Sequence, residues 1–346
     1  MLVSFGVSGH AALSHFLARC GMVRTDYMQC LDRKQDNSIL WIDSCWKGYE
    51  NPSQKALAIM HKETFFMLVR DPISRIKSIV NHGGFKNRLF ENNITFNMDT
   101  KPCVVLDRHG YRDIDDTTIH SVPIINSQFI NHMLSNVWSF AYYSNISHLP
   151  LDSNITYLDM QELMPNKAFD TITKLAHEFG FTPPKNEDRS FYEEIKYGEF
   201  SYILPLICEI VLHDTTVVCI HISTKYAQCE KNIIDILFET YHPLLDKVSF
   251  SMSESDLKAL QEDKETLSKV KSYMQDFLIE LHKRTEFIKQ NKKHETDVLN
   301  IFQNDRDLYY KVKTMLDKEL IHIKTHRPDI VASWKYYQEF EKIYNA

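Results

Sequence analysis

The sequence predicts an α/β fold with a parallel sheet at its core, and three observations support this. Short apolar runs alternate with stretches whose apolar residues recur every three or four positions, as strands followed by helices do. Residues 64–69 form an apolar run, which is typical of a strand buried on both faces. Hydrophobic residues make up 43% of the 346 residues, enough for a sizeable core.

The first 187 residues carry most of this pattern, and we expect them to form one domain. Residues 86–120 are polar and irregular, and we expect a long surface excursion there. Turn residues and apolar spacing set the limits of the other elements. Strands are predicted over 2–7, 38–42, 64–69 and 154–159, and helices over 11–20, 73–80, 127–143 and 165–179.

The residue pattern changes after residue 187, and residues 188–346 are predicted to be a mainly helical second region. An apolar run at 201–212 and a β-branched run at 216–223 come first. From Ser253 onwards the chain is highly charged, with leucines and other apolar residues at helical spacing as far as Leu281. A solvated amphipathic helix is the favoured interpretation, and a coiled-coil partner helix is the alternative.

Composition excludes several classes of protein. The net charge of −6 argues against sequence-independent nucleic-acid binding. No apolar stretch approaches the ~20 residues that span a bilayer, so we expect no transmembrane segment. The seven cysteines are scattered without C-x-x-C spacing, so we expect no metal and a reducing, cytoplasmic location.

The turn after the first predicted strand is a candidate anion site. Small residues there lead directly into a helix, whose free N–H groups and dipole favour negative charge. The alternative is an ordinary tight turn between a strand and a helix. The residues expected to line the site are Gly6, Ser8, Gly9, His10, Ala11 and Ala12.

A second candidate site follows residues 64–69. Arg70 stands at the carboxyl end of this strand, where ligands bind in α/β sheets. Ser74 and Ser78 follow in the next predicted helix, and a guanidinium with hydroxyl donors suits a phosphate group. The alternative is that Arg70 pairs with a local carboxylate.

The run Val-Arg-Asp-Pro-x-x-Arg-x-x-Ser after an apolar strand resembles the 3′-phosphate-binding motif of the sulfotransferases that use 3′-phosphoadenylyl sulfate. The resemblance covers about residues 1–185, and it implies a three-layer parallel sheet of the P-loop type with this nucleotide as donor. Arg70 and Ser78 match the family's ligands for the 3′-phosphate. Asp159 and Leu163 take the places of an acidic residue and a leucine that follow a late strand.

The first turn departs from the family, which normally has a lysine followed by Gly-Thr. Gly9 or His10 stands in the place of the lysine, and Ala11-Ala12 replaces Gly-Thr. The family's lysine neutralises charge on the bridging oxygen during sulfuryl transfer. A protonated His10 could partly substitute for this lysine, and the alternative is that His10 is a helix-capping or solvated histidine.

A transferase also needs a base for its acceptor, and His82 and Asp43 are the candidates. The sequence therefore predicts sulfuryl transfer to a hydroxyl, for example of a surface glycan. Two alternatives stay open: a nucleotide- or nucleotide-sugar-dependent transferase, and a degenerate binding or scaffold protein. The closing segment, residues 326–340, resembles a bacterial family of unknown function, from which no chemistry carries over.

Overall fold

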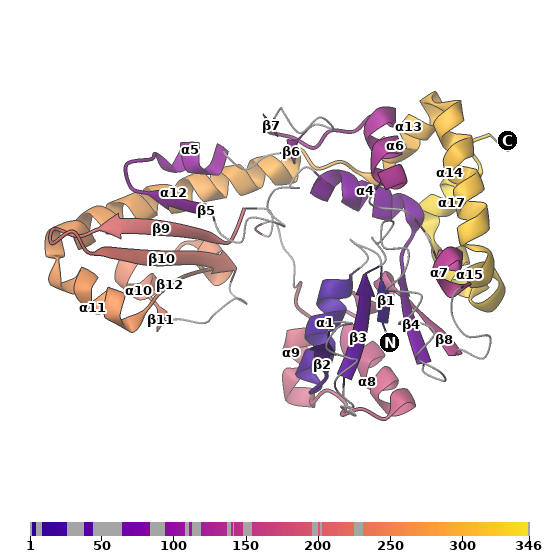
Figure 1. The fold of residues 1–346 in the computed structure, drawn as a ribbon, viewed down its shortest axis with the longest axis horizontal. Coiled ribbons are helices and arrows are strands. Elements are labelled where there is room, and N and C mark those ends of the chain that lie inside the picture. Colours follow the sequence, from indigo (N-terminus) through magenta and orange to yellow (C-terminus); the bar gives the residue numbers. More distant parts are fainter. Residues whose placement is uncertain are drawn as a thin grey trace. The chain divides into compact units, whose positions relative to one another are not determined.

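The chain has a mixed α/β fold with a mostly helical C-terminal part, seen in a computed structural model (Figure 1). Two compact units divide it, and they interleave along the sequence, whereas the sequence analysis places a single boundary near residue 187. Unit 1 comprises 1–80, 125–196 and 293–346, and unit 2 comprises 81–124 and 197–292. The structure describes residues 2–4, 9–25, 38–43, 64–83, 94–107, 111–112, 119–136, 140, 142–147, 154–195, 200, 203–224 and 231–344.

Unit 1 contains a five-stranded sheet in the order β2-β3-β1-β4-β8. Each neighbouring pair in this sheet is parallel. Strands are therefore confirmed in all four predicted ranges, although residues 5–7 of the first lie outside the described residues, and the short strand β2 was not predicted. The bounds are Leu2–Ser4 for β1, Val23–Thr25 for β2, Ser38–Asp43 for β3, Thr64–Val69 for β4 and Asn154–Asp159 for β8.

Alternating residues of these strands contact different helices. Leu68 and Leu158 share a buried cluster with apolar residues of α1 (His10–Arg19) and α8 (Ala168–Phe179). Tyr157, the neighbour of Leu158 on β8, instead forms a hydrogen bond of 2.7 Å with Nδ1 of His322 in α15. The period of two that a strand imposes on its side chains thus places different helices against the two faces.

The C-terminal segment of unit 1 is helical throughout. Short breaks separate its helices, and the carboxylate of Asp305 caps α14 by accepting from the Leu308 N–H. The predicted helix over 127–143 is α6 followed by α7. The remaining helices of unit 1 are α4 (Pro72–Gly83), α6 (Ser127–Asn136), α7 (Tyr142–Ile146), α9 (Arg189–Tyr192), α13 (Glu295–Asn304), α14 (Arg306–Glu319), α15 (Ile321–His326), α16 (Pro328–Ser333) and α17 (Lys335–Glu341), with 3-10 turns η1 (Met160–Leu163) and η2 (Asn186–Asp188).

Unit 2 contains a second five-stranded sheet, in the order β11-β12-β10-β9-β5. This sheet is mixed, because β5 is parallel to β9 while the other pairs are antiparallel. A pair of short strands, β6 and β7, accompanies it. The elements are β5 (Ile94–Asn97), α5 (Pro102–Asp107), β6 (Tyr111–Arg112), β7 (Ile119–His120), β9 (Leu206–Val211), β10 (Val217–Thr224), β11 (Lys231–Asn232), α10 (Ile234–Leu237), η4 (Pro243–Asp246), β12 (Val248–Met252), α11 (Glu254–Glu262) and α12 (Lys264–Gln290).

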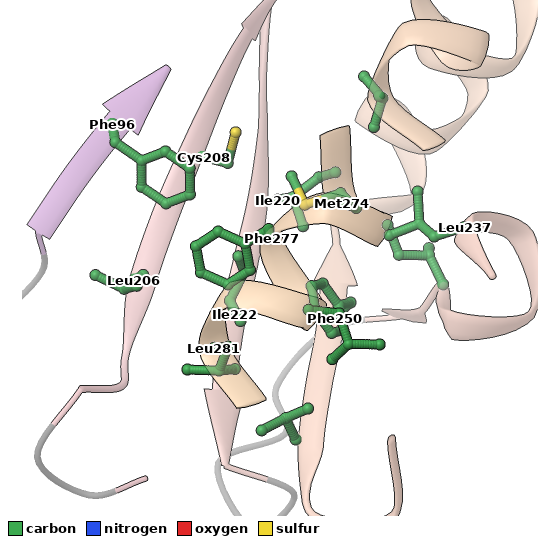
Figure 2. Close-up of a cluster of buried hydrophobic side chains, with 14 of the residues drawn as sticks. Phe96, Leu206, Cys208, Ile220, Ile222, Leu237, Phe250, Met274, Phe277 and Leu281 are labelled. Carbon is green, nitrogen blue, oxygen red and sulfur yellow. The ribbon is translucent and has the colours of Figure 1, made fainter. Parts of the chain in front are cut away.

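The long helix α12 supplies one side of the core of unit 2. Figure 2 shows Met274, Phe277 and Leu281 of this helix among side chains from the sheet. Phe277 stacks on Phe96 of β5, with ring centroids 5.5 Å apart. The apolar spacing seen in the sequence is therefore the buried stripe of an amphipathic helix.

Two expectations about unit 2 are wrong in detail. The segment 86–120 is not only a surface excursion, because its strand β5 completes the sheet beside β9. The helix expected from Ser253 does begin there, since the Ser253 hydroxyl accepts from the Asp256 N–H, but it ends at Asp263. The Asp263 carboxylate accepts from the Thr266 N–H and so starts α12 as a new helix.

Candidate functional site

The carboxyl ends of the parallel strands lie together at one edge of the sheet in unit 1. Val3 of β1 is opposite Met67 of β4, and Val69 is opposite Asp159 of β8. β1 and β4 are therefore adjacent and parallel. The next strand after β1 lies on one side of it, and the next strand after β4 that belongs to this sheet lies on the other side. The strand order therefore reverses between β1 and β4. Ligands bind in open α/β sheets at the carboxyl ends of the strands beside such a reversal.

Helix α1 begins at this edge with its positive end uncapped by any described side chain. Gly9 is its N-cap, and the first intrahelical hydrogen bond runs from the Leu13 N–H to the Gly9 carbonyl, 3.1 Å. The N–H groups of Ala11 and Ala12 precede that bond, and the first turn carries no acidic residue. This helix start therefore has the features of an anion site that the sequence predicts.

Gly9 is required here by its backbone conformation and by its neighbours. Its φ of 93° is in the left-handed region, which residues with a Cβ rarely adopt. A Cβ at this position would also lie 3.1 Å from Cγ of Met160, in the turn η1 that follows β8. The start of α1 thus packs closely against the end of β8. Gly6 and Ser8, the other glycine and serine of the predicted site, lie outside the described residues.

Arg70 directly follows β4 and is half-buried. Burial lowers the pKa of its guanidinium, while the negative charges of Glu295 and Asp71 act to raise it. Arginine stays charged in proteins at neutral pH, so Arg70 brings a positive charge to the sheet edge. Whether this charge faces the turn before α1 stays a prediction, because most of that turn lies outside the described residues.

Asp71, the neighbour of Arg70, joins two helices. One carboxylate oxygen accepts from the N–H groups of Ile73 and Ser74 at the start of α4. The other accepts from the N–H groups of Tyr336 and Tyr337 at the start of α17. Burial raises the pKa of Asp71, and these hydrogen bonds oppose the rise. The aspartate of the Arg-Asp-Pro motif therefore holds the C-terminal helix on the sheet edge.

Asp159 has a similar role at the end of β8. Its carboxylate accepts from the Gln161 N–H at 3.0 Å and from Nε1 of Trp334 at 2.8 Å. The Glu162 carboxylate accepts a hydrogen bond from the Asp159 N–H, which completes a capping box. Trp334 is fully buried, and Tyr337 and Phe340 after it are buried too, so the terminal aromatic segment packs in the core.

Ser74 and Lys77 of α4 converge on a carboxylate from a distant part of the chain. The Ser74 hydroxyl donates to Oε1 of Glu295 at 2.9 Å, and Nζ of Lys77 lies 3.2 Å from the same oxygen. Glu295 is the first residue of α13, and sequence reasoning missed it. Its separation of 221 residues from Ser74 explains why no local pattern pointed to it.

The remaining predicted residues fall in different places. Ser78 lies one turn beyond Ser74 and hence on a similar face of α4. His10 is the first residue of α1, whereas His82 is in the last turn of α4, about 15 Å along the axis from its start. Asp43 ends β3 opposite Ser4, which places its backbone at the sheet edge.

Helix α4 carries an arginine, Arg75, to which the sequence analysis gave no role. Arg75 is fully buried, and its guanidinium lies 4.5 Å from the centre of the Phe140 ring. Tyr142 is close enough for the charge of Arg75 to act on it, and burial raises the pKa of Tyr142 to about 12. This arginine serves the packing of α4 against the segment around α7, where a cation lies over a ring.

The described residues contain no group of three or more His, Cys, Asp or Glu side chains that could hold a metal ion. Among the described helices, none is both long enough and apolar enough to cross a membrane. A family model described as protein of unknown function (DUF2972) matches residues 157–345. No curated protein matches the chain, and no solved structure does.

Proposed function

Starting from the fact that the chain belongs to the DUF2972 family of proteins of unknown function, we propose that it is a transferase whose donor is 3′-phosphoadenylyl sulfate. The observation that carries the proposal is the adjacency of β1 and β4 in parallel. It brings the uncapped start of α1 and the half-buried Arg70 to one edge of one sheet. Two anion-binding groups on neighbouring strands suit a ligand with phosphates at two positions.

The start of α1 is assigned to the 5′-phosphosulfate of the donor. Ala11 and Ala12 contribute backbone N–H groups, and the helix dipole contributes about half a positive charge. Arg70, with Ser78 and Ser74 on α4, is assigned to the 3′-phosphate. The all-parallel sheet, with helices contacting alternate residues of β4 and β8, supports a three-layer arrangement of the sulfotransferase type.

In the reaction, an oxygen–sulfur bond forms between the acceptor hydroxyl and the donor's sulfur. The bond between sulfur and the bridging oxygen breaks, leaving adenosine 3′,5′-bisphosphate and a sulfate ester, and a base takes the hydroxyl proton. Asp43 is the better-placed base, because it ends β3 at the sheet edge while His82 is at the far end of α4. His10, at the start of α1, takes the role of the missing lysine when it is protonated.

One observation favours a second candidate, a transferase that uses another nucleotide or a nucleotide-sugar. Ser74 and Lys77 are engaged with a carboxylate, so the 3′-phosphate does not meet an empty cluster of donors. A donor without a 3′-phosphate would leave this contact in place. It would still use the start of α1 for its own phosphates.

A thermal-shift panel separates these candidates, because a ligand that binds only the native state raises the melting temperature. The panel contains adenosine 3′,5′-bisphosphate, ATP, GTP and nucleotide-sugars. We expect the bisphosphate to stabilise the wild type by about 2–3 kcal/mol at 100 times its dissociation constant. Arg70→Ala should abolish this shift, whereas Arg189→Ala, at an exposed arginine of the same unit, should retain it.

A positive panel is followed by an activity measurement with labelled 3′-phosphoadenylyl sulfate and a mixture of glycans. Labelled sulfate esters that disappear in the Arg70→Ala variant support the proposal. If ATP or a nucleotide-sugar stabilises the protein and the bisphosphate does not, the result favours the second candidate, a transferase with another donor. If no nucleotide shifts the melting temperature, the chain is a binding or scaffold protein and the proposal fails.

A further inference from the structure

The contact between α4 and Glu295 joins two distant parts of the chain in a sheltered place. Ser74 and Lys77 both reach the same oxygen, Oε1, and Glu295 is 15% exposed while Lys77 is 24% exposed. The pair Lys269–Glu265 on α12, by contrast, joins neighbours on one helix and is about two-thirds exposed. A carboxylate is therefore held by converging donors in a sheltered place.

Charge explains why this carboxylate stays ionised there. Burial alone would raise the pKa of Glu295, but Lys77 and the hydrogen bonds from Ser74 and Lys77 lower it below its usual range. Arg70 adds a further positive charge that interacts with Glu295. The surroundings are thus complementary to an anion, and the anion present is supplied by the chain itself.

The cap of α13 does not depend on this side chain. Asp297 accepts from the His294 N–H at 2.7 Å, and this contact belongs to the capping box of the helix. The Glu295 carboxylate can therefore leave Ser74 and Lys77 without removing this cap. It also interacts with the N–H of Glu295 itself, so its departure removes one contact from the first turn of α13.

We propose that Glu295 occupies the place of the ligand's 3′-phosphate and acts as an internal competitor that the nucleotide must displace. This inference rests on the proposed function. A phosphate carries more negative charge and more acceptor oxygens than a carboxylate, so it makes more bonds with Arg70, Ser74 and Lys77. Two anions repel each other in one sheltered place, so binding of the phosphate drives Glu295 out.

The competitor has a functional consequence. It raises the concentration of nucleotide that is needed for binding, since part of the binding energy goes into expelling the carboxylate. It also keeps singly charged anions from occupying the cluster. Binding is in this way coupled to movement of the first turn of α13, a segment of the family-matched region.

The first test measures affinity for adenosine 3′,5′-bisphosphate by calorimetry in the Glu295→Gln variant. Loss of the competing charge should tighten binding about tenfold, within the usual range of coupling between two sites. Glu339→Gln removes the same charge from a partly exposed position on α17, where the neighbour is Lys335, and should leave affinity unchanged. Equal affinities of the wild type and Glu295→Gln overturn the inference and leave the proposed function standing.

The second test uses inorganic phosphate in place of the nucleotide. Millimolar phosphate should raise the melting temperature of Glu295→Gln more than that of the wild type, and Lys77→Met in the same background should remove the difference. That result with no binding of the bisphosphate removes the proposed function and leaves Glu295 as the competitor of a phosphate on some other ligand. If phosphate has no effect on either protein, the cluster is not an anion site and the inference fails.

The third test needs no substitution at position 295 and so does not depend on whether that variant folds. Hydrogen exchange is measured on the wild type with and without the bisphosphate. Expulsion of Glu295 should speed exchange of the amides at 296–299 at least threefold while the bisphosphate is bound. Slower or unchanged exchange at these amides on a bound protein contradicts the inference.

Discussion

Two helices, α1 and α4, begin at the same edge of the sheet in unit 1, and they differ in whether carboxylates contact their first turns. At the start of α1 stand a glycine, a histidine and two alanines, with no carboxylate in the first turn. The start of α4 receives two carboxylates, Asp71 from its own N-terminal side and Glu295 from α13. Among the described residues, no carboxylate contacts the start of α1, whereas the first turns of α4 are contacted by two carboxylates of the chain itself.

This difference shows that the aspartate of the Arg-Asp-Pro motif has a structural role. Asp71 is committed to four backbone N–H groups of two helices, so its role is structural. Arg70, its neighbour, keeps its charge at the edge and is the residue assigned to a ligand. On the proposed function, one dipeptide would serve both stability and binding, and substitutions at its two positions should separate these roles.

The largest effect is expected from Asp71→Ala, which leaves four backbone donors without their acceptor. We expect the free energy of unfolding to fall by about 4 kcal/mol, because each buried unsatisfied donor costs about 1–3 kcal/mol and the costs are not additive. All four tryptophans fall in the sequence ranges of unit 1, so tryptophan fluorescence in urea measures its unfolding. Asp170→Ala, at an exposed position of α8, should change stability by less than ~0.5 kcal/mol. Equal effects of the two substitutions would show that Asp71 does not hold α17.

The next effect concerns the carboxylate at the end of β8. Trp334→Phe keeps an aromatic ring but removes the N–H that donates to Asp159. A hydrogen bond to a charged group contributes about 1.5–3 kcal/mol, so we expect a loss of about 2 kcal/mol in chemical denaturation. A loss near zero would mean that Asp159 is satisfied by its own capping box alone.

Much of unit 1 could be predicted from the sequence, because its strands and helices carry local signals. The apolar run of β4, the spacing along α8 and the turn before α1 each identify an element, and the alternation of strands and helices predicted that the sheet is parallel. The strand β5 was missed because Phe96 is the only buried apolar residue described in it. Glu295 was missed because its partners are more than 200 residues away.

A smaller effect tests the open start of α1 through its glycine. Gly9→Ala should cost about 2 kcal/mol, from the left-handed φ and from the Cβ contact with Met160. Gly180 has a φ of 74°, and no atom lies within 4 Å of the place that a Cβ would take, so Gly180→Ala should cost only the backbone strain, about 1 kcal/mol. Gly9→Ala should also weaken bisphosphate binding, and Gly180→Ala should not. If the two variants lose the same stability and bind the bisphosphate equally well, the start of α1 is not part of the binding site.

The smallest effect is the pH dependence of the Glu295 contact. The pKa of Glu295 is lowered below its usual value of 4.5 in the folded state. Its ionised form therefore stabilises the fold above pH 4.5, and this contribution is lost as pH falls through the lowered pKa. We expect the free energy of unfolding of the wild type to exceed that of Glu295→Gln by less than ~1 kcal/mol at pH 7. This difference should disappear below about pH 4. A gap that widens in acid would mean that the carboxylate is not held by positive charge.

Asp71 and Tyr336 are 265 residues apart, and this separation has a consequence for how the protein is made. A ribosome that adds about 5–20 residues per second reaches Tyr336 roughly 15 to 50 s after Asp71. During that interval every residue of unit 2 emerges, because its last residue is Lys292. We therefore expect unit 2 to be assembled while unit 1 still waits for the residues that close it around the Arg-Asp-Pro motif.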